Sequence, residues 1–163
     1  KQTALKILQS AKKNKCEIIL PNDLVIVTEF RQQARCSVAG IDAIPENGMA
    51  ADVGPSSVDL FAGALADCKT VVWNGPIGAF ETSPFDASTI GLARHIAKLT
   101  ARRKMRSIAG GGDTVAALSH AGVADSFSYI STAGGAFLEW LEGKKLPGVA
   151  ALMPKQSPRK RRA

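Results

Sequence analysis

Three times from residue 70 onward, a short apolar run is followed by a glycine-bearing turn and then by a helical pattern. The runs span residues 70–73, 106–109 and 128–131, and the helical patterns span residues 86–103, 113–121 and 136–142. Strands that alternate with helices form parallel β-α-β units, because a parallel neighbour is reached only through a crossover connection. We therefore predict an α/β fold in which a parallel β-sheet is flanked by helices on both faces.

The first half of the chain carries a weaker pattern. An amphipathic helix is predicted at residues 3–13, where apolar side chains recur at helical spacing. Residues 17–20 form a short apolar run that ends at Pro21, which indicates a buried strand, and a second β-rich run follows at residues 24–28. Residues 30–48 contain many turn formers, and only Ser37-Val38-Ala39 hints at a strand, so we expect an irregular excursion there.

The stretch Gly110-Gly111-Gly112-Asp113-Thr114 joins the second of the three strands to its helix and allows two interpretations. A helix N-terminus carries unpaired N–H groups and partial positive charge, and glycines let an anion come close, which suits a phosphate cradle. Alternatively, the stretch is a tight turn in which Asp113 caps the helix. In the same way, Ser56 or Ser57 and Asp86 are expected to cap the two preceding helices. The stretch alone does not decide between cradle and turn.

The three glycine turns are more informative together than singly. Parallel strands release their exit turns at one edge of the sheet, so residues 74–81, 110–114 and 132–135 should face a common crevice. Two helix N-termini at one crevice suit a polyanion such as the phosphates of a nucleotide. Asp113 beside phosphates would be repelled unless a cation lay between them, so it is a candidate magnesium partner. The Walker pattern and the dinucleotide fingerprint are both absent from the sequence.

Length, charge and cysteine content indicate a single-domain protein without a membrane span. The chain has 163 residues, enough for one domain with a hydrophobic core, and its net charge of +7 comes mainly from the cluster Lys155, Arg159, Lys160, Arg161 and Arg162. Apolar runs are all too short to span a membrane. The three cysteines are widely spaced, which is typical of reduced thiols in the cytoplasm. No pair of residues stands out as base and nucleophile. Phosphoryl transfer depends mainly on positioning and charge stabilisation, so a site for it without an obvious base is no contradiction.

Several ordered motifs resemble a known family. The segments VWNGPIGAFE (72–81), AGGGDT (109–114), YISTAGGA (129–136) and LEGKKLPGVAAL (141–152) are accompanied by ILP (19–21) and DVGP (52–55). Together they are similar to the C-terminal nucleotide-binding domain of phosphoglycerate kinase. The resemblance implies a Rossmann-like three-layer α/β/α domain over residues 1–152, incomplete at its N-terminal end. Residues 153–163 would be a basic tail, which we expect to be disordered.

The same resemblance implies a reaction and the residues that serve it. The family transfers a phosphoryl group between 1,3-bisphosphoglycerate and ADP, giving 3-phosphoglycerate and ATP with Mg²⁺, in glycolysis. Pro76 and Ala79 would line the base pocket, Glu81 would hold the ribose hydroxyls, and Asp113 would position the magnesium-nucleotide. The full nucleotide-binding set implied is Asn74, Gly75, Pro76, Ala79, Glu81, Gly111, Gly112, Asp113 and Thr114. The catalytic amides implied are those of Gly134 and Gly135, while Ala133 stands where many members have a third glycine.

The resemblance also sets what this chain would need from elsewhere. In the family a separate N-terminal domain binds 3-phosphoglycerate, and that domain and the first strands of the nucleotide-binding domain would lie before Lys1. We therefore expect a fragment that binds ATP or ADP, is inactive alone, and belongs to a usually monomeric family. Two other hypotheses stay open: a stand-alone module that binds a nucleotide or a partner without catalysis, and weak nucleic-acid binding through the basic tail.

Overall fold

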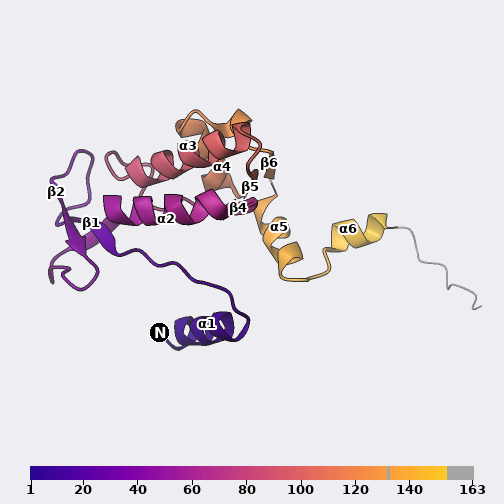
Figure 1. Cartoon of the computed structure of the whole chain (residues 1–163), viewed down its shortest axis with the longest axis horizontal. Coiled ribbons are helices and arrows are strands. Elements are labelled where there is room, and N and C mark those ends of the chain that lie inside the picture. Colours follow the sequence, from indigo (N-terminus) through magenta and orange to yellow (C-terminus); the bar gives the residue numbers. More distant parts are fainter. Residues whose placement is uncertain (132, 154–163) are drawn as a thin grey trace, which may run out of the picture.

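The computed structural model, which describes residues 1–131 and 133–153, contains a parallel three-stranded sheet (Figure 1). Its strands are β4 (Thr70–Asn74), β5 (Arg106–Gly110) and β6 (Tyr129–Ser131), in the order β4-β5-β6. Both strand pairs are parallel. The predicted α/β fold with a parallel sheet flanked by helices is confirmed, and the three strands lie within one residue of the predicted runs.

The helices that precede and connect these strands build the main core. They are α2 (Pro55–Asp67), α3 (Ala87–Ala101) and α4 (Gly112–His120), and a 3₁₀ turn (Ala124–Ser126) leads into β6. Successive strand residues face opposite sides of a sheet. Trp73 and Ala109 are buried against Leu92, Ile96 and other residues of the helices. On the opposite face Val72 and Tyr129 remain 44% and 60% exposed.

A second, antiparallel sheet was not expected from the sequence. It contains β1 (Asp23–Val27), β2 (Cys36–Gly40) and β3 (Met49–Val53) in the order β2-β1-β3. Its own small core includes Val27, Ala51 and Phe85, which are almost fully buried. Part of the predicted irregular excursion at residues 30–48 is therefore the strand β2, although the loops on either side of it are irregular.

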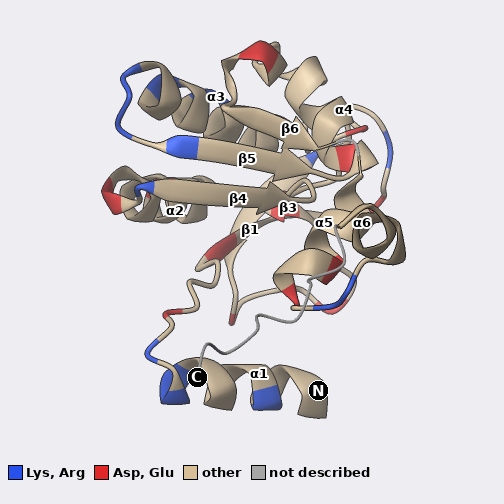
Figure 2. Ribbon diagram, turned by 90° about the vertical axis from the view of Figure 1, so that its right-hand side faces the viewer, with Lys and Arg blue, Asp and Glu red and all other residues tan. Residues whose placement is uncertain are grey.

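The N-terminal segment departs further from expectation. Helix α1 (Gln2–Lys13) forms as predicted but buries none of its residues, and Figures 1 and 2 both show it away from the sheets. Residues 17–20 are not a strand, so that prediction is wrong. A strand requires a neighbour to accept its backbone hydrogen bonds, and within the described ranges no strand pairs with these residues. Ile18, Ile19 and Leu20 consequently stay 37–59% exposed.

The described chain ends with two short helices, α5 (Gly134–Leu141) and α6 (Pro147–Leu152). Predicted residues that fall on Thr132 and on 154–163, including the basic cluster, lie outside the described part of the chain. Among the residues that are described, no helix has the length and apolar character needed to cross a bilayer.

Candidate functional site

The carboxyl ends of the three parallel strands are level with one another. Asn74 pairs in register with Gly110, and Gly110 pairs with Ser131. Figure 2 shows the arrows of β4 and β5 pointing to the same edge, where α4 and α5 begin nearby. The glycine turns that leave these strands therefore emerge side by side. This is the edge at which open parallel sheets bind ligands.

The first two turns are joined by a hydrogen bond. The amide of Gly75 donates to Oγ1 of Thr114 at 2.7 Å. Thr114 is only 1% exposed and lies in the first turn of α4, so its hydroxyl is held in place by packing. A Cβ on Gly111 would stand 3.4 Å from Oδ1 of Asn74, which places that side chain close against the second turn. The strand order and this bond bring Asn74, Gly75, Gly111 and Thr114 together.

The second and third turns touch through their backbones. A Cβ on Gly134 would overlap the backbone nitrogen and Cα of Gly111, so no larger residue fits there without movement. Gly111 has a φ of +101°, a conformation that favours glycine, and is the residue that precedes the first turn of α4. Gly134 is the first residue of α5, whereas Gly135 beside it faces open space. The N-termini of α4 and α5 are therefore adjacent, as the cradle interpretation requires.

Asp113 lies in the first turn of α4 but does not cap the helix. Gly111 is the N-cap residue, and no side chain bonds the amides at this end. The Asp113 carboxylate is exposed and, within the described residues, takes part in no hydrogen bond or ion pair. A cavity of about 230 Å³ lies against it and is lined also by Glu81, Ala79 and Phe30. Because the helix gains no cap from it, this carboxylate is free to meet a ligand.

Two predicted base-pocket residues lie on different cavities. Ala79 lines the small cavity beside Asp113, whereas Pro76 lines an apolar cavity of about 480 Å³ with Asn74, Gly75 and residues of α2 and α3. The small cavity is below the range of about 300–1,000 Å³ that is usual for organic ligands. The described residues therefore bring the glycine turns together, whereas Pro76 and Ala79 do not share one cavity. Gly112, another predicted contact, is exposed at the start of α4.

Phe30 was missed by sequence reasoning. It is 52% exposed, stacks on Phe85 with ring centroids 5.6 Å apart, and lines the same cavity as Glu81 and Asp113. The one signal in the sequence that could have drawn attention to it is a large aromatic residue in a turn-rich segment.

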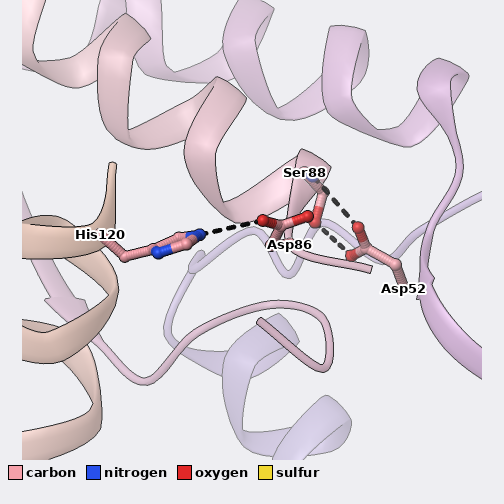
Figure 3. A network of polar contacts seen from close by, with 4 residues as sticks. All are labelled: Asp52, Asp86, Ser88 and His120. Atoms are coloured by element: carbon pink, nitrogen blue, oxygen red, sulfur yellow. Dashed lines mark hydrogen bonds and ion pairs between the residues drawn. The ribbon is translucent and has the colours of Figure 1, made fainter. Parts of the chain in front are cut away.

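The turn that carries Ala79 and Glu81 is supported by a buried carboxylate. Asp52 of β3 is 5% exposed and accepts the Ser88 amide at 3.1 Å and also the Ser88 hydroxyl, as Figure 3 shows. A Cβ on Gly78 would overlap this carboxylate, and the Ala79 amide donates to the Ala51 carbonyl at 2.9 Å. Burial raises the pKa of Asp52; the hydrogen bonds from Ser88 oppose this and the nearby Asp86 charge adds to it. Asp52 thus fixes the turn and the start of α3 together.

The predicted helix caps are corrected by these contacts. The Asp86 side chain makes no capping bond to α3 and lies 3.0 Å from Nε2 of His120, at the end of α4 (Figure 3). Ser56 and Ser57 do not cap α2, which begins at Pro55. Their amides donate instead to the carboxylate of Asp23, from β1, at 3.1 and 2.7 Å. Both helices are capped from β1 or β3, which local sequence cannot reveal.

The capping bonds also determine the titration of Asp23. Burial alone would raise the pKa of this carboxyl group. The Ser57 hydroxyl and the amides of Ser56 and Ser57 outweigh that effect, so the pKa lies below its ordinary value. Asp23 is therefore a carboxylate that favours folding when it is ionised.

These features define a class: an α/β protein whose parallel sheet gathers glycine turns and helix N-termini at one edge, as phosphate-binding proteins do. Comparison with known proteins identifies the family. A sequence profile described as phosphoglycerate kinase matches residues 1–144, and the chain belongs to the phosphoglycerate kinase family.

Individual relatives support the same family. Proteins named phosphoglycerate kinase from Methylorubrum extorquens and Rhodopseudomonas palustris are 55% and 56% identical over 151 and 153 residues, or 93% and 94% of this chain. The solved structure of phosphoglycerate kinase from Coxiella burnetii is 42% identical and superposes with a TM-score of 0.85 over 91% of this chain. The chain spans about 38% of the length of the two sequence relatives and 37% of the Coxiella chain.

Proposed function

We propose that this chain is the nucleotide-binding part of a phosphoglycerate kinase. In that role it would hold ATP or ADP for reversible phosphoryl transfer between 1,3-bisphosphoglycerate and ADP, which gives 3-phosphoglycerate and ATP in the cytoplasm. The observation that carries the proposal is the joining of three glycine turns at one sheet edge, through the Gly75–Thr114 hydrogen bond and the Gly111–Gly134 contact. Phosphoryl transfer depends mainly on positioning and charge stabilisation, which such an edge supplies.

Each residue's proposed role follows from its position at the sheet edge. Backbone amides at the adjacent N-termini of α4 and α5, from Gly111, Gly112, Gly134 and Gly135, would hold the phosphates and the transferred group. Asn74 and the Thr114 hydroxyl would fix the turn against them. Ala79 and Glu81 share a cavity with Asp113. This supports a role in which Glu81 would hold the ribose hydroxyls of a nucleotide whose phosphates would lie at α4. Pro76 would meet the base from the neighbouring cavity.

The residues present fit a magnesium ion that arrives with the nucleotide. Mg²⁺ is usually held by one or two carboxylates together with substrate phosphates and water. Asp113 offers one exposed carboxylate beside the glycine turn, and within residues 1–131 and 133–153 no group of three or more acidic, histidine or cysteine side chains forms a complete metal site. When bound, the ion would neutralise charge on the phosphates. Asp113 would orient it from the first turn of α4.

The binding step can be tested on the protein by amide NMR with magnesium-ADP. We expect shifts at Gly110–Thr114, Gly134 and Gly135, and Mg²⁺ alone should leave them unchanged. Asp113→Asn should weaken binding of magnesium-ADP far more than binding of ADP in chelator. Asp125→Asn, a matched acidic substitution in the 3₁₀ turn, should change neither. Unshifted amides at both helix N-termini would refute the assigned site.

Activity needs a separate test, because this chain covers a minor part of its relatives' length. We expect no turnover from the 163 residues alone, with transfer appearing when the remaining family sequence is joined to them. A longer protein that binds magnesium-ADP at these amides yet transfers no phosphoryl group would support a nucleotide-binding module that has lost catalysis.

A further inference from the structure

A second polar cavity lies at the edge of the parallel sheet opposite to the glycine turns. It has a volume of about 540 Å³ and lies where β4 and β5 begin. Four of its lining residues are cations (Lys69, Arg103, Lys104 and Arg106), and no acidic residue lines it. The volume falls within the range of about 300–1,000 Å³ found for small-molecule sites.

The cations converge from separate parts of the chain. Lys69 precedes β4, Arg103 and Lys104 follow α3, and Arg106 opens β5. Figure 2 shows this basic colouring at the starts of β4 and β5 and in the loop that enters β5. Within the described part of the chain, none of the four forms an ion pair. Asp67 ends α2 close by in sequence, but it does not line the cavity.

The dipole of α3 explains only part of this cluster. Cations at a helix C-terminus are favoured by the partial negative charge there, which accounts for Arg103 and Lys104. It does not account for Lys69 and Arg106, which belong to other elements. Arg103 also occupies a position with φ of +56°, where the Lys104 amide donates back to the Leu99 carbonyl at 3.1 Å. Such a position ordinarily favours glycine. An arginine there adds a positive charge but has a less favourable backbone conformation than glycine would have.

Hydroxyl groups complete the donor set. Ser128 lines the cavity and is exposed, and its Oγ accepts the Ser107 amide at 3.1 Å, which leaves its proton available to another acceptor. Thr100 also lines the cavity, but its hydroxyl already bonds the Ile96 carbonyl at 2.9 Å. Met105 also lines the cavity and is 4% exposed.

We propose that this cavity binds a small phosphate-bearing molecule, held by Lys69, Arg103, Lys104 and Arg106 and by the Ser128 hydroxyl. Guanidinium and ammonium groups form charge-assisted hydrogen bonds to phosphate oxygens, and the arginines can do so through two N–H groups at once. The concave shape and the volume suit a compact ligand. The site is distinct from the glycine turns, which lie at the other ends of the same strands.

The test uses inorganic pyrophosphate as probe, followed by amide NMR at physiological salt, where exposed charges are screened beyond about 8 Å. We expect saturable shifts at Lys104–Arg106 and Ser128 that are separate from any at Gly110–Thr114. Arg103→Gly combined with Arg106→Thr should weaken this binding about tenfold or more, because each removes a charge-assisted contact. Lys12→Gln with Lys13→Gln on α1 removes the same charge elsewhere and should leave it unchanged.

The single variant Arg103→Gly should fold normally, since glycine suits the backbone at this position, so its weaker binding could not be due to misfolding. It should melt no lower than the parent and still weaken pyrophosphate binding. The proposal is overturned if the shifts occur only at Gly110–Thr114, or if the α1 variant weakens binding as much as the cavity variant. It is also overturned if affinity for oligonucleotides rises steadily with their length, which would mark an open nucleic-acid surface.

Discussion

Replacing Gly134 by alanine should destabilise the protein, because the added methyl group has no space. A Cβ at this position would overlap the backbone nitrogen and Cα of Gly111 and lie 3.2 Å from the carbonyl carbon of Gly110. All three are backbone atoms, so a turn must move to admit the methyl group. Overpacking of this kind costs about 1–3 kcal/mol. For a chain of this size that corresponds to a fall in melting temperature of about 2–12 °C.

Gly135 provides a control at the adjacent position. A Cβ there would meet nothing within 4 Å, and the residue belongs to the first turn of α5. Alanine is up to about 1 kcal/mol more favourable than glycine in a helix, so Gly135→Ala should leave the melting temperature unchanged or raise it slightly. Thermal and denaturant unfolding of both variants measures the difference. Equal melting temperatures for the two variants would show that α5 does not pack against Gly111 as the structure indicates.

Substitutions at three further positions test contacts elsewhere in the protein. Thr114→Val should lower the free energy of unfolding by about 1–3 kcal/mol, because the Gly75 amide loses its acceptor. Thr114→Ser keeps the hydroxyl and should lower it less. Equal losses for the two variants in denaturant unfolding would contradict this reasoning. Asp23→Asn should reduce the free energy of unfolding at pH 7. Because folding lowers the pKa of Asp23, the difference between parent and variant should shrink as pH falls below about 3.9. A difference in unfolding free energy that is independent of pH would argue against the Ser57 contact. His95→Leu should raise the free energy of unfolding by about 1 kcal/mol, because the buried Nε2 has no hydrogen-bond partner in the described part of the chain. A variant that is less stable than the parent in denaturant unfolding would contradict this.

The parallel sheet could be predicted because its signals are local and repeated. Each strand is an apolar run that a glycine turn ends, and each following helix has its own periodicity. The register then follows from geometry, since parallel strands must align their exit turns, and Asn74, Gly110 and Ser131 do lie level. The closeness of Gly111 and Gly134 follows from the same reasoning, although their direct backbone contact does not.

The antiparallel sheet could not be predicted by the same means. The β-rich run predicted at residues 24–28 does form β1, and Ser37-Val38-Ala39 gave a hint of β2. Because β2 is mostly exposed, that hint was too short to outweigh the turn formers around it. The run at residues 17–20 shows the converse error. It has the composition of a buried strand, yet pairing is a tertiary property and no described strand lies beside it. In both cases the missing information concerns neighbours.

The same limit explains why sequence motifs predict ligand contacts but not the groups that support them. Asp52 lies more than twenty residues before the turn at 75–81, yet its carboxylate holds the start of α3 through Ser88 and leaves room only for glycine at position 78. Thr114, by contrast, lies inside a motif, and its hydroxyl oxygen already accepts a hydrogen bond from the Gly75 amide. A residue assigned to phosphate contact from sequence therefore also joins two turns of the protein. Loss of binding on its removal would have to be separated from loss of that link, which is why Thr114→Ser is the necessary companion to Thr114→Val.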